Sequence, residues 1–272
     1  MHQWRLAALF VISGMGTAFA LRRRTWQQYV SERGTRLGIP LLFTVYILFF
    51  GIFEFTEKTT LLFTIFPGSE DMPYGHLWFV YNLLIYSIIL TPFFFHVKAN
   101  PEGFIMRLVR SIMNVRAGLG ILILPPIILS LNAILFKPWA FGEVGMWWEF
   151  PRYMLYFLFG FLMISVRDEY FAALDKIRIP LTILTPILAV LWFIISLTSG
   201  IPNVMEGGWV DEGYRPFSVT ATMASILQSF HAWSWCLLIF TWSSKLLNEP
   251  NKYLAYLNES VYPTYIVHLH IT

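Results

Sequence analysis

Apolar runs alternate with short polar connectors along almost the whole chain. The runs fall near residues 6–21, 37–55, 76–95, 117–136, 151–166, 179–199, 218–243 and 259–272. A helix rises about 1.5 Å per residue and a hydrocarbon core is about 30 Å thick, so runs of about twenty residues suit membrane-spanning helices. The pattern therefore predicts an all-α integral membrane protein, a polytopic bundle with eight transmembrane segments present.

The first apolar run and the connector after it show how the chain begins to cross the membrane. The uncharged stretch 6–21 is short for a span, but Trp4 and Arg5 lengthen it at one interface. The three arginines Arg22 to Arg24 follow at the other interface, where long basic side chains reach the headgroups. Pro40 opens the next run, which must cross back, so Arg33 and Arg36 lie at the same membrane face as these three arginines.

Composition narrows the class of protein further. The chain is 57% hydrophobic and only 13% charged, whereas a soluble domain carries about 25% charged residues. A single cysteine, Cys236, excludes an internal disulfide and a thiolate metal cluster, so we expect no metal. No linker or fixed-period repeat divides the chain, which predicts one transmembrane domain over residues 1–272. We expect the lipid bilayer, and no nucleic acid, among its partners.

Basic residues gather on alternate connectors, which predicts the orientation. One side holds fourteen of the nineteen and the other four, with Arg5 remaining at the start. The fourteen are Arg22, Arg23, Arg24, Arg33, Arg36, Lys98, Arg107, Arg110, Arg116, Arg167, Lys176, Arg178, Lys245 and Lys252, and the four are Lys58, Lys137, Arg152 and Arg215. The positive-inside rule places the fourteen in the cytoplasm and the start of the chain outside. Glu149 and Arg152 fall on the outer connectors in this interpretation.

The two ends of the chain raise a separate expectation. An outside start suggests a missing helix before Met1, and the last run stops after fourteen residues at Thr272. We therefore expect an internal piece of a larger protein.

Several polar residues are candidates for chemistry, although the sequence motifs of soluble nucleotide-binding and hydrolytic enzymes are absent. Arg33 and Arg36 are three residues apart, which on a helix places both on one face able to grip phosphates. Anchoring at the membrane face is the simpler explanation. Ser13 and Gly14 allow either close packing of two helices or a local helix break that lines a cavity.

Three histidines are also candidates. His76 opens a span at the outer face, where it either bonds a loop or acts as a general base. His268 lies within the last span, where an ionisable side chain is a functional candidate. His231 has several aromatic neighbours, so packing is the favoured explanation for it.

The order of these landmarks resembles the pattern of acyltransferase family 3. The landmarks are Ile12-Ser13-Gly14 on the first helix, Arg33-Gly-Thr-Arg36 with Pro40, His76-Leu-Trp-Phe79, Tyr156-Phe-Leu-Phe-Gly160 and Tyr262-Pro-Thr-Tyr-Ile-Val-His268. Together they cover nearly all of the chain and are most similar to members grouped with glucan-biosynthesis acyltransferases. The chain departs from the family at its start, because the family's first helix, with an arginine and a catalytic histidine, is not found and His2 does not match it.

This resemblance implies roughly ten membrane helices and an enzyme that moves an acyl group, often acetyl or succinyl, from acyl-CoA to a carbohydrate or glycan hydroxyl. It implies that Arg33 and Arg36 contact the coenzyme, and we assign Ser13 and Gly14 to the same cofactor-binding set. His76 and His268 are the catalytic candidates, and a bacterial-type inner membrane is the expected location. A transporter or flippase of a glycan or lipid, and an inactive truncated acyltransferase, remain the alternatives.

Overall fold

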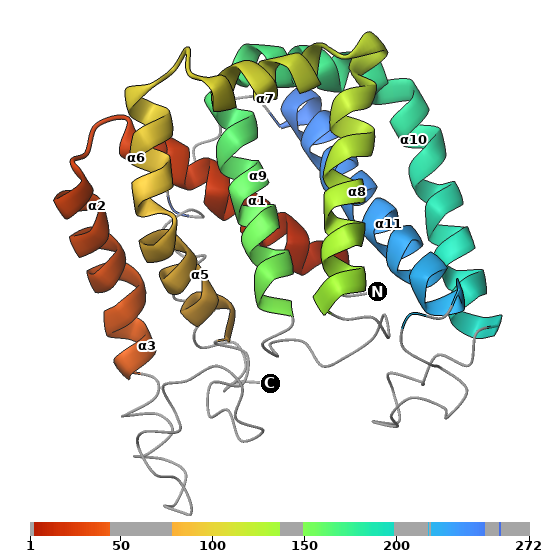
Figure 1. The fold of residues 1–272 in the computed structure, drawn as a ribbon, viewed down its shortest axis with the longest axis horizontal. Coiled ribbons are helices and arrows are strands. Elements are labelled where there is room, and N and C mark those ends of the chain that lie inside the picture. The colour runs from red at the N-terminus through yellow and green to blue at the C-terminus, as the bar shows by residue number, and fades with distance from the viewer. Residues whose placement is uncertain are drawn as a thin grey trace, which may run out of the picture. The chain divides into compact units, whose positions relative to one another are not determined.

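The computed structural model describes residues 3–43, 78–136, 149–198, 217, 219–247 and 256, and every regular element within these ranges is helical (Figure 1). The all-α prediction is therefore confirmed for the described residues. The elements are α1 (Gln3–Leu21), α2 (Trp26–Arg33), the π-helix η1 (Gly34–Gly38), α3 (Ile39–Phe43), α5 (Trp78–Ile89), α6 (Thr91–Ala99), α7 (Phe104–Asn114), the 3₁₀-helix η4 (Arg116–Gly118), α8 (Leu119–Phe136), α9 (Phe150–Ser165), α10 (Arg167–Thr198) and α11 (Val219–Leu246).

The chain forms two compact units. The first unit comprises Met1–Phe19 and His96–Lys245, and it contains most of α1 together with α7 to α11. The second comprises Ala20–Phe95 and Leu246–Thr272, and its described helices are α2, η1, α3, α5 and most of α6.

Within the described ranges, four helices are long and apolar enough to cross a membrane. They contain the segments Trp4–Leu21, Leu119–Phe136, Arg167–Ile195 and Thr222–Leu246, and the bent pair α5–α6 makes a fifth if it is one span. Helix α9 is apolar but shorter. The described residues thus support four or five of the eight predicted spans by length; the run 37–55 is described only to Phe43, and 259–272 lies outside the described residues.

The break between α5 and α6 has a local cause. The two helices meet at an angle of 49° around Leu90, directly before Thr91-Pro92. Pro92 has no N–H for the carbonyl four residues earlier, and its ring crowds the preceding turn. The Thr91 hydroxyl donates to the Ser87 carbonyl at 2.6 Å, which satisfies one backbone acceptor beside the break. The predicted span 76–95 is therefore bent.

Helix α10 differs from the sequence prediction, which placed a polar connector at 167–178 before a span at 179–199. The structure shows a single 32-residue helix from Arg167 to Thr198. Its charged half is amphipathic and buries Tyr170, Ala173, Leu174 and Ile177, which explains why a stretch with many charges is helical. In Figure 1 this half runs beside α7 across one end of the first unit, and the apolar half continues along α8 and α11.

Helices α1 and α9 approach each other at two glycines. A side-chain carbon added at Gly14 would collide with the Phe157 carbonyl, and one added at Gly160 would collide with the Val11 carbonyl. Small residues at helix crossings allow such backbone contact, which maximises van der Waals packing where water provides no hydrophobic driving force. Helix α1 is continuous through Ser13 and Gly14, so the structure supports close packing over a helix break.

A tryptophan joins α11 to α8 at a proline. Pro125 lies inside α8 and cannot donate to the carbonyl of Ile121, four residues earlier. The Trp233 indole N–H donates to that carbonyl at 2.8 Å, and both groups are buried. The indole therefore replaces the helix hydrogen bond that Pro125 removes, in the buried interior of the first unit.

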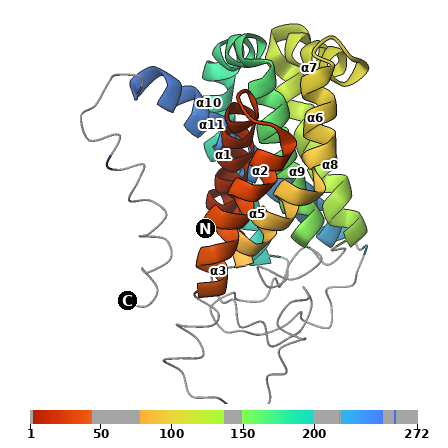
Figure 2. The same cartoon turned by 90° about the vertical axis from the view of Figure 1, so that its left-hand side faces the viewer.

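One end of the first unit collects basic side chains. Arg110 on α7 pairs with Glu102 at 2.7 Å and with Glu169 on α10 at 3.4 Å. Lys245, at the end of α11, pairs with Asp175 on α10 at 2.9 Å. These contacts bring together α7, the beginning of α10 and the end of α11, as the alternation of basic connectors predicts. Figure 2 shows α7 and the beginning of α10 at the same end.

Candidate functional site

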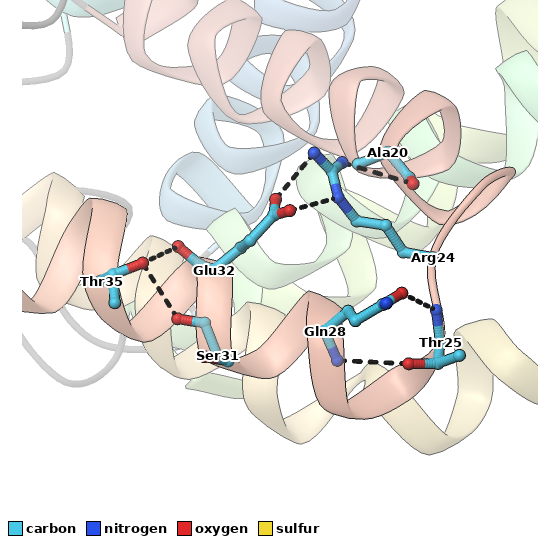
Figure 3. A network of polar contacts seen from close by, with 7 residues as sticks. All are labelled: Ala20, Arg24, Thr25, Gln28, Ser31, Glu32 and Thr35. Carbon is cyan, nitrogen blue, oxygen red and sulfur yellow. Dashed lines mark hydrogen bonds and ion pairs between the residues drawn. The ribbon is translucent and has the colours of Figure 1, made fainter.

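The arginine-rich connector of the second unit has a defined conformation. Arg24 donates from Nε to Glu32 Oε1 at 2.8 Å, and its Nη2 lies 2.7 Å from Glu32 Oε2 (Figure 3). The same guanidinium donates to the Ala20 carbonyl in the last turn of α1. One arginine therefore caps the end of α1 and binds α2 with a two-point contact, the geometry that favours arginine over lysine.

A capping box fixes the beginning of α2. The Gln28 backbone N–H donates to the Thr25 hydroxyl at 3.4 Å, and the Thr25 backbone N–H donates to the Gln28 side chain at 3.0 Å. This reciprocal pair satisfies two backbone donors that a helix start otherwise leaves open. The capping box and the Arg24 contact together set the direction of α2, which ends at Arg33 and leads into η1 with Arg36.

Arg33 and Arg36 lie on either side of the start of the π-helix η1. The Arg33 guanidinium lies over the Tyr29 ring, 5.2 Å from its centroid, while Arg36 is exposed. A π-helix has more residues per turn than an α-helix, so η1 rotates Arg36 away from the shared face expected for α-helical spacing. Pro40 offers no N–H to the Arg36 carbonyl, which is a local reason for the change of helix type.

The other predicted site residues are distributed differently. Ser13 and Gly14 lie in the first unit, whereas Arg33 and Arg36 lie in the second. The Ser13 carbonyl accepts a hydrogen bond from the Thr17 hydroxyl at 3.0 Å, and Gly14 is the contact point with α9. His76 and His268 lie outside the described residues, so their catalytic role stays a prediction.

A buried polar cluster on α9 was not singled out by the sequence analysis. Glu149 and Arg152 lie at the start of α9 with side chains only 7% exposed, and Arg152 Nη1 is 3.6 Å from Glu149 Oε2. The sequence places both on outer connectors, and the structure shows that their side chains are buried there. Their opposite charges three residues apart at a helix start are the sequence signal that indicates an ion pair.

Two buried tyrosines follow this ion pair on α9. Tyr153 contacts Phe10 of α1 with ring centroids 4.9 Å apart, and Tyr156 lies 6.2 Å from the Trp233 ring of α11. Charged groups in an apolar interior are tolerated when they are paired and hydrogen-bonded. The first turns of α9 thus combine a buried ion pair with two tyrosines that contact α1 and α11.

His231 also lies inside the first unit, on α11. Its ring stacks on Trp192 of α10 at 5.6 Å, and its Nε2 accepts a hydrogen bond from the Trp235 indole at 2.9 Å. Because Nε2 is the acceptor, the neutral imidazole carries its proton on Nδ1, which makes no hydrogen bond within the described residues. The packing explanation favoured for His231 agrees with these contacts.

The described residues contain no group of three or more His, Cys, Asp or Glu side chains able to hold a metal ion.

Helices of membrane-spanning length, together with a structured basic connector, define the chain as a helical membrane-type protein. It belongs to acyltransferase family 3, whose model, described as an acyltransferase domain, matches residues 1–272. No curated protein and no solved structure matches the chain. The family membership supports an acyl-transferring enzyme, as the ordered landmarks of the sequence predict.

Proposed function

We propose that the protein is a multi-pass enzyme of a bacterial-type inner membrane that transfers an acetyl- or succinyl-class acyl group from acyl-CoA to a carbohydrate or glycan hydroxyl. The observation that carries the donor assignment is the connector geometry. Arg24 is engaged with Glu32 and Ala20, whereas the Arg36 side chain is exposed. Arg33 lies over the Tyr29 ring and is partly exposed. Guanidinium groups bind phosphates through charge-assisted, often bidentate hydrogen bonds, and coenzyme A carries several phosphates.

In this mechanism the acceptor hydroxyl oxygen attacks the thioester carbonyl while a histidine takes its proton. The carbon–sulfur bond then breaks, and coenzyme A leaves as a thiol after receiving a proton. His76 and His268 are the proposed residues for polar and proton-transfer roles, since an imidazole titrates near neutral pH. Hydrogen-bond donors directed at the carbonyl oxygen would stabilise the negative charge that develops there.

The donor assignment predicts the effect of conservative substitutions. Arg33→Lys and Arg36→Lys keep the positive charge but lose the planar fork of donors. We expect each to weaken acetyl-CoA binding about tenfold, because a hydrogen bond to a charged group contributes about 1.5–3 kcal/mol. Titration of the purified protein with acetyl-CoA measures the affinity, and thermal unfolding checks that each variant is folded.

Arg23→Lys is the matched control, because Arg23 is an exposed arginine of the same connector outside the Arg33–Arg36 pair. It should bind acetyl-CoA as the unmodified chain does. If the variants at 33 and 36 also bind normally, these two arginines only anchor the connector. Movement of a glycan across vesicles without release of coenzyme A would instead favour the transporter alternative.

A further inference from the structure

Helix α7 has two faces of different composition. Met106, Val109 and Met113 are buried against the first unit, where α7 contacts α8, α9 and α10. The opposite face carries Phe104, Arg107, Leu108 and Ser111, all of which are exposed. The spacing of three and four residues places these four side chains along one stripe. The exposed stripe therefore combines apolar and cationic side chains.

The apolar members of this stripe are exposed. Phe104 is 74% exposed and Leu108 is 49% exposed, although the buried face of the same helix is well packed. Val115, directly after the helix, is 44% exposed. Apolar side chains of this size are favourable in an apolar environment and unfavourable in water. Their exposure points to contact with a non-aqueous layer.

The cations of the same region divide into two groups. Arg110, on the flank of α7, is engaged with Glu102 and Glu169. Arg107 and Arg116 are exposed and lie on or directly after the exposed stripe. These two guanidiniums are therefore placed to meet negative charge at the same surface as Phe104 and Leu108.

The position of α7 in the first unit indicates where the exposed stripe lies relative to the membrane. Figure 1 shows α7 lying across one end of the first unit, whereas α8 and α9 run along its length. This end carries the basic side chains that the alternation of connectors assigns to one membrane face. An amphipathic helix that lies across the end of a membrane bundle occupies the boundary between headgroups and acyl chains.

We propose that α7 is an anionic-lipid-binding helix at the surface of the membrane. Phe104 and Leu108 insert among the upper segments of the acyl chains, and Arg107 and Arg116 bind the phosphates of anionic phospholipids. Both contributions come from the exposed stripe of α7 and from Arg116 of η4 just after it, and apolar burial and attraction to anionic headgroups act together at this depth. Glu102 and Glu169 hold α7 in place through Arg110.

Insertion of the apolar stripe is tested with the full chain in vesicles of equal parts phosphatidylcholine and phosphatidylglycerol. A single cysteine at position 104, in a Cys236→Ala background, carries an environment-sensitive fluorophore; a second variant carries it at the exposed position of Lys176. We expect blue-shifted emission at 104, quenched by lipids labelled near the headgroup, and quenching by aqueous iodide at 176. Equal iodide quenching at both positions would overturn the proposal.

Lipid binding is tested separately with Arg107→Gln and Arg116→Gln. A cation near an anionic membrane surface changes binding about five-fold. We therefore expect each variant to retain about five-fold less phosphatidylglycerol in competition with phosphatidylcholine, measured by mass spectrometry of the protein–lipid complex. Lys176→Gln removes an exposed charge outside the stripe and should retain the lipid normally. Equal losses in all three variants would indicate general attraction to net charge and contradict a site on α7.

Discussion

Gly14 and Gly16 are two residues apart on α1, yet their surroundings differ. A methyl group at Gly14 would meet the Phe157 backbone, whereas a methyl group at Gly16 would meet nothing within 4 Å. We expect Gly14→Ala to destabilise the fold by about 1–3 kcal/mol, the usual cost of overpacking. Gly16→Ala should be neutral or slightly stabilising, because alanine favours helix. Thermal unfolding in detergent measures both, and equal midpoints would contradict the proposed α1–α9 contact.

The sequence suggested this contact only as one of two possibilities. Ser13-Gly14-Met15-Gly16 indicates a site where backbones approach, but the run does not say which glycine faces a neighbour or which helix that neighbour is. Those facts depend on the rotation of α1 against α9. Similarly, the charges of Glu149 and Arg152 are plain in the sequence, but their burial follows from packing of α9 against helices distant in the chain.

At the scale of the elements, the hydrogen bond from Trp233 to Ile121 connects α11 to α8. It predicts that the effects of substitutions at Trp233 and Pro125 on stability depend on each other. Trp233→Phe keeps an aromatic ring but leaves the buried Ile121 carbonyl without its donor, which costs about 1–3 kcal/mol. Pro125→Ala supplies the missing N–H within α8. We therefore expect Trp233→Phe to be less destabilising in the Pro125→Ala background, as measured by a double-mutant cycle of unfolding free energies.

Trp242→Phe is the control for this cycle. Trp242 also lies on α11 and donates a hydrogen bond, but its partner is the exposed Thr182 hydroxyl of α10. Its effect should be the same with either residue at position 125. An additive result for Trp233 and Pro125 would show that the indole does not compensate for the proline.

The helix positions were predictable because a continuous run of apolar residues can be recognised from the local sequence alone. The runs near 6–21, 117–136, 151–166 and 218–243 correspond to α1, α8, α9 and α11 within a few residues. The extension of α10 through a charged stretch was not predicted, because hydropathy marks only its apolar part. The π-helix η1 was also missed: Pro40 marks a helix boundary in sequence, but the change of turn size before it arises from the folded backbone.

At the scale of the whole molecule, the distribution of basic residues predicts which connectors face the cytoplasm. Single cysteines at Gln27 and Thr59, in a Cys236→Ala background, test this on intact cells with an impermeant maleimide. Position 27 avoids Thr25, whose side chain caps α2. We expect labelling at 59 and protection at 27 until the membrane is permeabilised. The reverse pattern would overturn the orientation and the cytoplasmic donor assignment.

The buried pair of Glu149 and Arg152 restricts how this protein can change over generations. Loss of one partner leaves the other charge buried and uncompensated, at a cost of about 3–5 kcal/mol, comparable to a large part of a typical domain's stability. Substitution of both by apolar residues of similar volume need not be costly. The two positions are therefore expected to change together or to stay unchanged. A variant with only one of the two substitutions is the destabilised intermediate between the ionic and the apolar versions of this cluster.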